Sequence, residues 1–494
     1  MHMDRELRVA FVSAPYRIFD TYRKVGKHPT NGIVTLAGEL LDHGITDDVR
    51  IFDGAFYGSM EELVSDVKSF EPSMLGIPGY TGSMPEAERI FKSMPDVPIK
   101  ITGGPYSSAR PEELLEYCDV VFVGEAEESI KEFAAAAKEN GKFSPDYASE
   151  IKGLVFKDKD GSVVRTGKPR IVSDLDSISF RGRELTADHM PHYRVGNYRH
   201  LGDNFITLMS SRGCASKCIY CCSNMMHGSG YRLRSPESLE AEIDFVEDLR
   251  KKRGLPPLDS VKFDDDEFFS RNENDLANLL HVLNKRDLRF TAFVTMGATT
   301  PEKVRIAAEN GMKSAFTGIE THEGRRKKVC PGKRSRFTDE EIKETLEWFR
   351  KHDVRSCCGY IVGFPDETLD DMRMTSDCMT KLPVDYPSMS VLAIHPGTPL
   401  WRWQQKNVHL YKDLVKKPFS RVDVERWPGD PDGLPSPHPE MAKGQLLAIK
   451  KEAYRAAYND PDRIFRLMKA AKDPSEALKT MVAFNEFYFD ANRD

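Results

Sequence analysis

Three cysteines lie close together near the middle of the chain, at Cys214, Cys218 and Cys221, directly after a run that favours a β-strand. Their spacing, C-x3-C-x2-C, puts three thiols on one short loop. Three thiolates can each bind one iron of a four-iron cluster, and the fourth iron then keeps an open position for a small molecule. The loop therefore predicts a redox-active [4Fe-4S] site with one free coordination position.

A closed zinc site is the alternative for the same loop. Zinc needs a fourth ligand, and Cys222 and His227 are close in sequence. Neither residue completes the paired C-x2-C spacing that is typical of zinc knuckles, so the pattern favours the iron-sulfur cluster.

Three other cysteines have separate interpretations. Cys330 lies in a polar loop beside lysines, which would lower the pKa of its thiol if they are close in space, and a redox role for it stays open. Cys357 and Cys358 lie in an apolar run, where at least one side chain is expected to face the core. No second group of three cysteines is local, which disfavours a second cluster.

The composition is ordinary for a soluble globular enzyme. Of 494 residues, 40% are hydrophobic and 30% are charged, and a net charge of −6 argues against general nucleic-acid binding. No apolar segment has the length of a signal peptide core or approaches the roughly 20 residues of a membrane-spanning helix. The nine cysteines are clustered and odd in number, which argues against a disulfide framework. We therefore expect a cytoplasmic enzyme without nucleic acid among its partners.

The first 130 residues alternate between short β-rich runs and helical stretches, which is typical of a doubly wound parallel (Rossmann-like) sheet. The ligand crevice of such a sheet lies at the carboxyl ends of its strands. Several of these strands end in glycine. Turns between strands and helices also need glycine, so these glycines by themselves do not decide whether the crevice binds a ligand. No G-x-G-x-x-G opens a helix after the first strand, which disfavours a nicotinamide or flavin. The candidate ligand contacts at the strand ends are Thr81, Ser83, Gly103, Gly104, Gly124 and Glu125.

A second α/β series begins at about residue 203. Its six predicted strands, each followed by a helical stretch, favour a partial (β/α)6 barrel that is open on one side. A β-hairpin is predicted around Asp160 and Gly161, and two amphipathic helices are predicted after a Pro- and Gly-rich loop at 426–440. The expected division is a Rossmann-like domain at 1–145, a linker with a hairpin at 146–200, the barrel at 201–400, and a helical, substrate-covering region at 401–494.

Five motifs, in order along residues 205–400, resemble those of the radical S-adenosylmethionine (radical SAM) superfamily. Besides the cysteine motif, in which Tyr220 directly precedes the third cysteine, they are FDDDEF at 263–268, GIET at 318–321, GYIVGFP at 359–365 and PGTPL at 396–400. The resemblance implies that the open iron binds S-adenosylmethionine. An electron from a flavodoxin- or ferredoxin-type donor would then cleave the sulfonium and generate a radical that abstracts hydrogen from the substrate.

The resemblance also assigns residues. It implies that Cys214, Cys218 and Cys221 are the cluster ligands. The cofactor contacts that it implies are Tyr220 near the adenine, Gly318, Glu320, Gly363 and Asp265, although an aspartate at a strand end can also simply cap the next helix.

The N-terminal half resembles the cobalamin-binding domain that is fused to one branch of this superfamily. The matching stretches are GIVTLAGELLDHG at 32–44, LGIPGYTGS at 75–83, ITGGP at 101–105 and VFVGEAEE at 121–128. No D-x-H-x-x-G motif is present, so no histidine ligand below the cobalt is expected. The corrin would be held mainly by backbone and shape.

In that branch, one S-adenosylmethionine methylates the cobalt, a second supplies the radical, and the substrate radical takes the methyl group. The resemblance thus implies methylation of an unactivated carbon in a small molecule or peptide. Two alternatives are a cyclisation like that of the anaerobic porphyrin-ester cyclases, with or without cobalamin, and a non-catalytic carrier of metal or corrin. Substrate specificity is expected in the C-terminal region and the loops at the barrel mouth, which include Tyr231, Trp401 and Trp427, although aromatic residues in such places more often pack than contact a substrate. The basic run at 324–328 is expected to be a solvated helix face, with recognition of an anionic substrate as the alternative.

Overall fold

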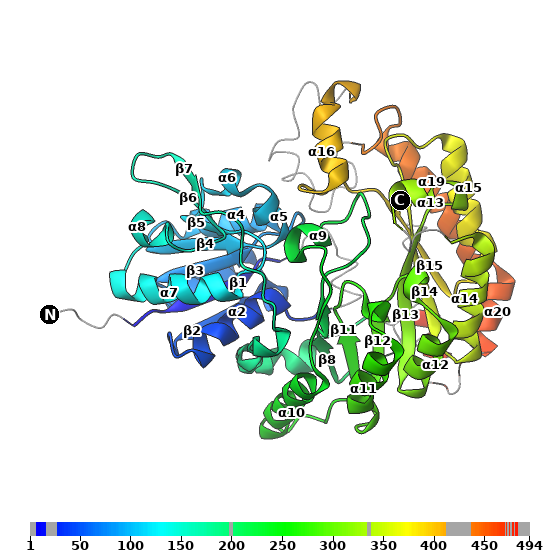
Figure 1. The fold of residues 1–494 in the computed structure, drawn as a ribbon, viewed down its shortest axis with the longest axis horizontal. Helices are drawn as coiled ribbons and strands as arrows, with labels where there is room; N and C mark the ends of the chain where they lie inside the picture. The colour runs from blue at the N-terminus through cyan, green and yellow to red at the C-terminus, as the bar shows by residue number, and fades with distance from the viewer. Residues whose placement is uncertain are drawn as a thin grey trace.

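Two β-sheets, one in each half of the chain, organise the protein (Figure 1). The computed structural model describes residues 6–15, 27–196, 201–332, 337–411 and 436–469, together with single residues between 471 and 482. The predicted loop at 426–440 lies mostly outside the described residues, and so does Trp427. Among the described residues, no helix has the length and apolarity that a membrane crossing requires.

The first sheet has seven strands in the order β2-β1-β3-β4-β5-β6-β7. The first five are parallel, and the hairpin predicted around Gly161 joins their edge as the antiparallel pair β6 and β7. Because the strand order reverses between β1 and β3, a crevice opens at their carboxyl ends. The bounds are β1 (Val9–Ser13), β2 (Val49–Asp53), β3 (Met74–Pro78), β4 (Ile99–Gly103), β5 (Val120–Phe122), β6 (Leu154–Lys157) and β7 (Val163–Arg165).

Helices cover both faces of this sheet, because each strand is apolar on both sides. One buried cluster joins the strands to α2 and α7, and a second joins their other face to α3, α4 and α6. This two-sided burial is the reason for the nearly continuous apolar runs in the sequence. The bounds are α2 (Asn31–Asp42), α3 (Met60–Ser69), α4 (Met84–Ser93), α5 (Pro105–Ala109), α6 (Pro111–Leu114), α7 (Glu127–Asn140) and α8 (Pro145–Ala148).

The second sheet has six parallel strands that follow the chain order, β8-β11-β12-β13-β14-β15. Strands β8 and β15 are its two edges, which confirms the predicted partial barrel. The bounds are β8 (Phe205–Leu208), β11 (Ser260–Phe263), β12 (Arg289–Phe293), β13 (Met312–Glu320), β14 (Arg355–Val362) and β15 (Tyr386–Val391).

The barrel helices begin where the sequence places capping residues. The Ser235 hydroxyl accepts a hydrogen bond from the Ser238 amide at the start of α10, and Thr338 forms a reciprocal capping box with Glu341 at the start of α14. The helices are α10 (Pro236–Lys252), α11 (Glu273–Asn284), α12 (Pro301–Glu309), α13 (Glu323–Val329), α14 (Asp339–Lys351), α15 (Leu369–Lys381) and α16 (Pro399–Lys406).

The C-terminal helices α19 (Lys443–Tyr458) and α20 (Pro461–Lys469) confirm the predicted amphipathic pair. Helix α19 packs against α15 and the edge strand β15. The short helix α9 (Ser223–His227) lies between the two halves (Figure 1), and it follows directly after the three cysteines. The cysteine loop therefore lies where the barrel faces the first sheet.

Candidate functional site

The cysteine loop runs from the end of β8 to α9, and backbone hydrogen bonds hold it from two directions. The Ile219 amide donates to the Val329 carbonyl (3.0 Å), and the Ile219 carbonyl accepts from the Leu400 amide (2.9 Å). Leu400 closes the PGTPL motif, and Val329 ends α13, so two distant segments fix the middle of the loop. Gly213 opens the loop at a φ of +92°, and a Cβ there would overlap the Gly230 carbonyl oxygen.

The thiols of this loop have the surroundings that an iron-sulfur cluster needs. The Ser216 amide donates to the Cys214 Sγ (3.4 Å), and the Ser223 amide donates to the Cys221 Sγ (3.5 Å). Backbone N–H groups that point at cysteine sulfurs stabilise thiolate ligands of a cluster. The donor set of three sulfurs on one loop therefore fits a [4Fe-4S] cluster. Among the described side chains, no three His, Cys, Asp or Glu groups converge closely enough to hold a single metal ion.

Glu320 lies next to Tyr220 of the cysteine loop. Burial raises the pKa of Glu320 to about 7, and the neighbouring Tyr220 hydroxyl partly offsets that rise. Glu320 has a φ of +68°, a left-handed conformation that is strained for a residue with a side chain. A Cβ on Gly318 would overlap the Glu320 carboxylate, so Gly318 leaves the space that this carboxylate fills.

Gly363 forms a turn after β14, at the carboxyl end of the sheet. Its φ is +93°, and the Glu367 carboxylate accepts hydrogen bonds from the amides of Gly363 (2.6 Å) and Phe364 (3.0 Å). Burial raises the pKa of Glu367 to about 7. Gly363 thus supplies the backbone conformation of the turn, and Glu367, which the sequence analysis does not single out, holds it closed.

Asp265 is placed differently from the prediction that it contacts a cofactor. It is buried, its carboxylate accepts hydrogen bonds from Ser210 and Ser211, and it pairs with Arg271 (3.0 Å). These partners occupy both carboxylate oxygens, so Asp265 fixes the end of β8 and the start of the cysteine loop. The neighbouring Asp264 is the aspartate that lines the cavity described next.

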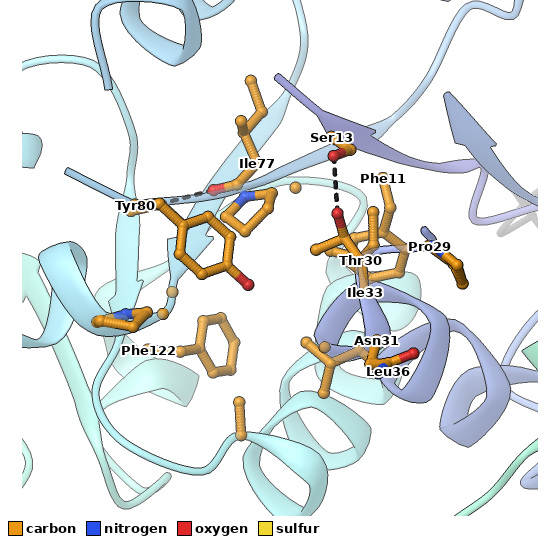
Figure 2. Close-up of a pocket in the computed structure, with 18 of the residues that line it drawn as sticks. Phe11, Ser13, Pro29, Thr30, Asn31, Ile33, Leu36, Ile77, Tyr80 and Phe122 are labelled. Carbon is orange, nitrogen blue, oxygen red and sulfur yellow. Dashed lines mark hydrogen bonds between the residues drawn. The ribbon is translucent and has the colours of Figure 1, made fainter. Parts of the chain in front are cut away.

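A cavity of about 730 Å³ lies at the carboxyl ends of β1, β3 and β4, between the first sheet and the cysteine loop. Figure 2 shows the rings of Tyr80 and Phe122 on one side of it, with Ile33 and Leu36 across from them. The Ser13 and Thr30 hydroxyls, 2.8 Å apart, form part of its polar rim. The barrel contributes Met209, Arg212, Met226, His227 and Asp264.

Four of the six predicted strand-end contacts line this cavity: Gly103, Gly104, Gly124 and Glu125. Thr81 and Ser83 are not among its lining residues. Thr81 instead lies 3.3 Å from the Nδ1 of His395 in the barrel, and Ser83 is buried at the start of α4. The prediction grouped these two with the others because all six lie at or after the carboxyl ends of parallel strands, but Thr81 and Ser83 follow β3 at a point where the chain no longer lines the cavity. A large, mostly apolar cavity with glycine backbone at its edge fits a large ligand such as a corrin.

A buried ion network joins the cavity to both ends of the cysteine loop. Arg212 donates to Glu127 (2.5 Å) and lies 3.6 Å from Glu125, while Glu125 accepts from His227 (2.9 Å) and Arg232 (2.6 Å). The side chains of Arg212, Glu125 and Glu127 are 7%, 1% and 8% exposed. Burial alone would raise the pKa of Glu125, but the His227 and Arg232 hydrogen bonds hold that pKa below its usual range.

This network bears on one alternative left open by the sequence and includes one residue that the sequence analysis missed. His227, considered as a fourth zinc ligand, is held by a carboxylate of the other sheet. Arg212 is missing from the sequence predictions, because its partners lie more than 80 positions away; the only local signal is its place directly before the glycine of the cysteine motif.

The basic run in α13 is only in part the solvated face that the sequence favours. Lys327 and Lys328 are exposed, whereas Arg325 and Arg326 are buried. Arg325 and Lys328 pair with Asp366 in the turn before α15, and Arg326 pairs with Asp339 at the start of α14 (2.5 Å). These ion pairs with distant carboxylates are not visible in a local stretch of sequence.

Cys330 differs from its prediction as well. A hydrogen bond with Cys218, together with burial, raises the pKa of its thiol, so neighbouring lysines do not activate it. Tyr231 donates to the Glu267 carbonyl (2.9 Å). Trp401 packs against the same apolar cluster as Cys330 and Tyr220, and Arg110 of the first half lies over its ring. Cys357 and Cys358 are both buried, in agreement with their apolar run.

Comparison with known families matches the two halves separately. Residues 208–379 match the Radical SAM superfamily, and residues 24–134 match the B12 binding domain. An uncharacterised methyltransferase of Pyrococcus horikoshii is 25% identical over 405 residues, covering 80% of this chain and 82% of that protein.

Two further comparisons bear on the fold and the chemistry. The anaerobic magnesium-protoporphyrin IX monomethyl ester cyclase of Cereibacter sphaeroides is 24% identical, covering 82% of this chain and 65% of the cyclase. The radical S-adenosylmethionine methyltransferase TsrM from Kitasatospora setae, solved with cobalamin and a [4Fe-4S] cluster bound, superposes with a TM-score of 0.63 at 19% identity. That alignment covers 81% of this chain and 78% of TsrM, and it establishes the shared fold.

Proposed function

Because this chain joins a B12-binding domain to a radical SAM domain, we propose that it is a cobalamin-dependent radical SAM enzyme that methylates an unactivated carbon. The cofactors are a [4Fe-4S] cluster, S-adenosylmethionine and cobalamin. The substrate is a small molecule or peptide, and the reductant is a flavodoxin- or ferredoxin-type protein. The two binding sites follow the domain boundaries expected from the sequence: residues 1–145 bind the corrin, and residues 201–400 bind the cluster.

One observation carries this proposal: a single short segment serves both sites. Residues 209–227 hold the three cysteines, and the same segment supplies Met209, Arg212, Met226 and His227 to the wall of the cavity. A corrin in the cavity and a cluster on the loop would therefore be immediate neighbours. Methyl transfer to a substrate radical requires that the methyl carrier and the radical source face one shared space.

The residues of the chain have distinct tasks in this scheme. Cys214, Cys218 and Cys221 bind three irons; when bound, the cluster and S-adenosylmethionine supply radical chemistry, and cobalamin supplies the methyl carrier. Glu320 and Tyr220 would offer a carboxyl and a hydroxyl to S-adenosylmethionine. The apolar wall formed by Phe122, Ile33 and their neighbours would keep water away from a bound corrin, which protects reactive intermediates from side reactions.

Filling the cavity with a larger side chain tests the proposal that cobalamin binds there. Ala126 lines the cavity at the start of α7, and Ala135 lies exposed on the same helix. We expect Ala126→Trp to weaken binding of hydroxocobalamin, followed by its absorption spectrum under anaerobic conditions, while Ala135→Trp binds it as the wild type does. Equal binding by both variants would place the corrin elsewhere.

Isotope labelling tests the reaction. The reconstituted, chemically reduced enzyme is incubated with methyl-deuterated S-adenosylmethionine and a metabolite extract. We expect 5'-deoxyadenosine together with a product that carries the deuterated methyl group, and neither should form with Cys218→Ala. Absence of 5'-deoxyadenosine from the wild type would support the non-catalytic carrier instead.

Radical cyclisation is the second candidate, and the similarity to the anaerobic ester cyclase favours it. The same incubation separates the two functions. A cyclase forms 5'-deoxyadenosine and a product that has lost hydrogen, and this product carries no deuterium from the methyl group.

A further inference from the structure

The cysteine loop belongs to a closed excursion of the chain between two short strands, β9 (Ser211–Arg212) and β10 (Arg232–Leu233). These strands pair in antiparallel fashion, and Arg212 lies directly opposite Arg232. Like charges in directly opposite positions destabilise a strand pair. The base of the loop therefore needs negative charge from another part of the molecule.

The carboxylate of Glu125 supplies part of that charge from the first half of the chain. Glu125 follows β5 and lines the cavity, and its side chain is 1% exposed. It accepts hydrogen bonds from Arg232 (2.6 Å) and His227 (2.9 Å), and it lies 3.6 Å from Arg212. Arg212 lies two positions before the first cysteine of the loop, and His227 lies six positions after the last. One side chain of the cavity wall thus holds the chain on both sides of the cysteines.

Two neighbours fix this carboxylate and its cations further. The Val172 amide donates to Glu125 (2.8 Å), and the Val172 carbonyl accepts from Arg232. Glu127, which also lines the cavity, accepts from the Arg212 guanidinium (2.5 Å). Because these groups are buried, a shift of Glu125 would take a buried cation away from its partner, which is costly. The position of Glu125 and the closure of the loop base therefore depend on each other.

We propose that Glu125 is a positioning residue that couples the two sites, so that a ligand in the cavity favours the closed loop that holds the cluster. This inference deepens the proposed function, since it requires a corrin in the cavity and a cluster on the loop. A ligand packed against the cavity wall limits the positions open to Glu125, and a cluster limits those open to the loop. Each ligand then binds a chain that the other has already ordered, and both affinities rise by the same factor.

The test compares hydroxocobalamin binding to the full chain with and without the cluster, which is reconstituted anaerobically from iron and sulfide. Equilibrium dialysis with cobalt analysis gives the two dissociation constants. We expect the cluster-loaded wild type to bind about tenfold more tightly than the protein without the cluster. Glu125→Gln keeps the shape of the side chain but removes its charge, so this ratio should fall to about one. A purely structural role would weaken binding in both forms and leave the ratio unchanged.

Two more variants separate coupling from the general effect of a lost charge. Arg232→Met breaks the same contact from the side of the loop and should also lower the ratio, and it decides the question if Glu125→Gln fails to fold. Glu242→Gln is the matched control. Glu242 is likewise a buried carboxylate between two arginines, Arg183 (2.8 Å) and Arg234, but it does not line the cavity. Glu242→Gln should therefore keep the wild-type ratio.

Three results would overturn the coupling. They are a wild-type ratio close to one, a Glu125→Gln ratio equal to that of the wild type, and an equal fall of the ratio in Glu242→Gln. The proposed function would stand in each of these cases, since both cofactors would still bind. Failure of the wild type to bind hydroxocobalamin or iron would instead remove the proposed function and the coupling together.

Discussion

The two sites of this protein are built in opposite ways. The cysteine loop relies on a few groups with specific chemistry: three thiols within eight positions, fixed by backbone hydrogen bonds to Val329 and Leu400. The cavity relies on many residues from several strands and helices, most of them apolar side chains and glycines, and its charged groups are paired with one another at one side. We infer that the activity of the loop depends on a few individual sulfur atoms, whereas ligand binding in the cavity depends on many residues that together form its shape.

Removal of one thiol is the strongest test of that contrast. Cys214→Ala should lower bound iron and 5'-deoxyadenosine formation by more than about 100-fold, because losing a ligand costs more than losing a supporting hydrogen bond. Iron analysis and product chromatography after anaerobic reconstitution measure this. Cys222→Ala should retain both, and a similar loss in Cys222→Ala would mean that the site uses a different set of cysteines.

The second-largest effect is expected when the ion network between the two sites is broken. Arg212→Met leaves the buried carboxylate of Glu127 without its cation, which should destabilise the protein by about 3–5 kcal/mol. Thermal and urea unfolding measure the change. Arg305→Met is the control, because Arg305 pairs with Glu302 and Glu309 on an exposed helix face and should cost less than about 1 kcal/mol. Equal effects would show that the network contributes no more than a surface pair.

The turn at Gly363, which Glu367 holds closed, should make the stability of the protein depend on pH. The pKa of Glu367 is raised by burial from 4.5 to about 7, so the folded state binds this proton more tightly than the unfolded state. The resulting stability is complete below about pH 4.5 and is lost as pH rises through about 7, a loss of about 3 kcal/mol by pH 8.

Glu367→Gln isolates this contribution, because the amide oxygen can still accept the Gly363 and Phe364 N–H groups. We expect the wild type to lose more unfolding free energy between pH 5 and pH 8 than Glu367→Gln does. Parallel pH profiles of the two proteins would refute a raised pKa at this position.

The cavity should show the smallest effect of a single change. Leu36→Ala removes one part of the apolar wall, and we expect hydroxocobalamin affinity to fall by about tenfold, or about 1.4 kcal/mol. Spectroscopic titration of the apoprotein measures this, and bound iron should be unchanged. Complete loss of binding would mean that one wall residue dominates, contrary to a distributed site.

Local patterns were enough to predict most of the fold. Strands such as β3, β11 and β14 form at the apolar, β-rich runs of the two predicted α/β series, because such runs between helix caps leave few alternatives. The predicted cluster and cofactor contacts at Cys218, Tyr220 and Glu320 also come together, since the carboxyl ends of parallel strands meet at one edge.

The sequence by itself therefore determined the two α/β sheets, the three-cysteine loop and its chemistry, because each depends on residues that are neighbours along the chain. Only the tertiary structure decided that Arg212 pairs with Glu127, that structural hydrogen bonds occupy the Asp265 carboxylate, and that the Cys330 thiol lies near the Tyr220 hydroxyl. It also decided the shape of the cavity. The physical reason is that burial, ion pairing and hydrogen bonding act over a few ångströms of space, and no local pattern records which distant segments the fold brings that close.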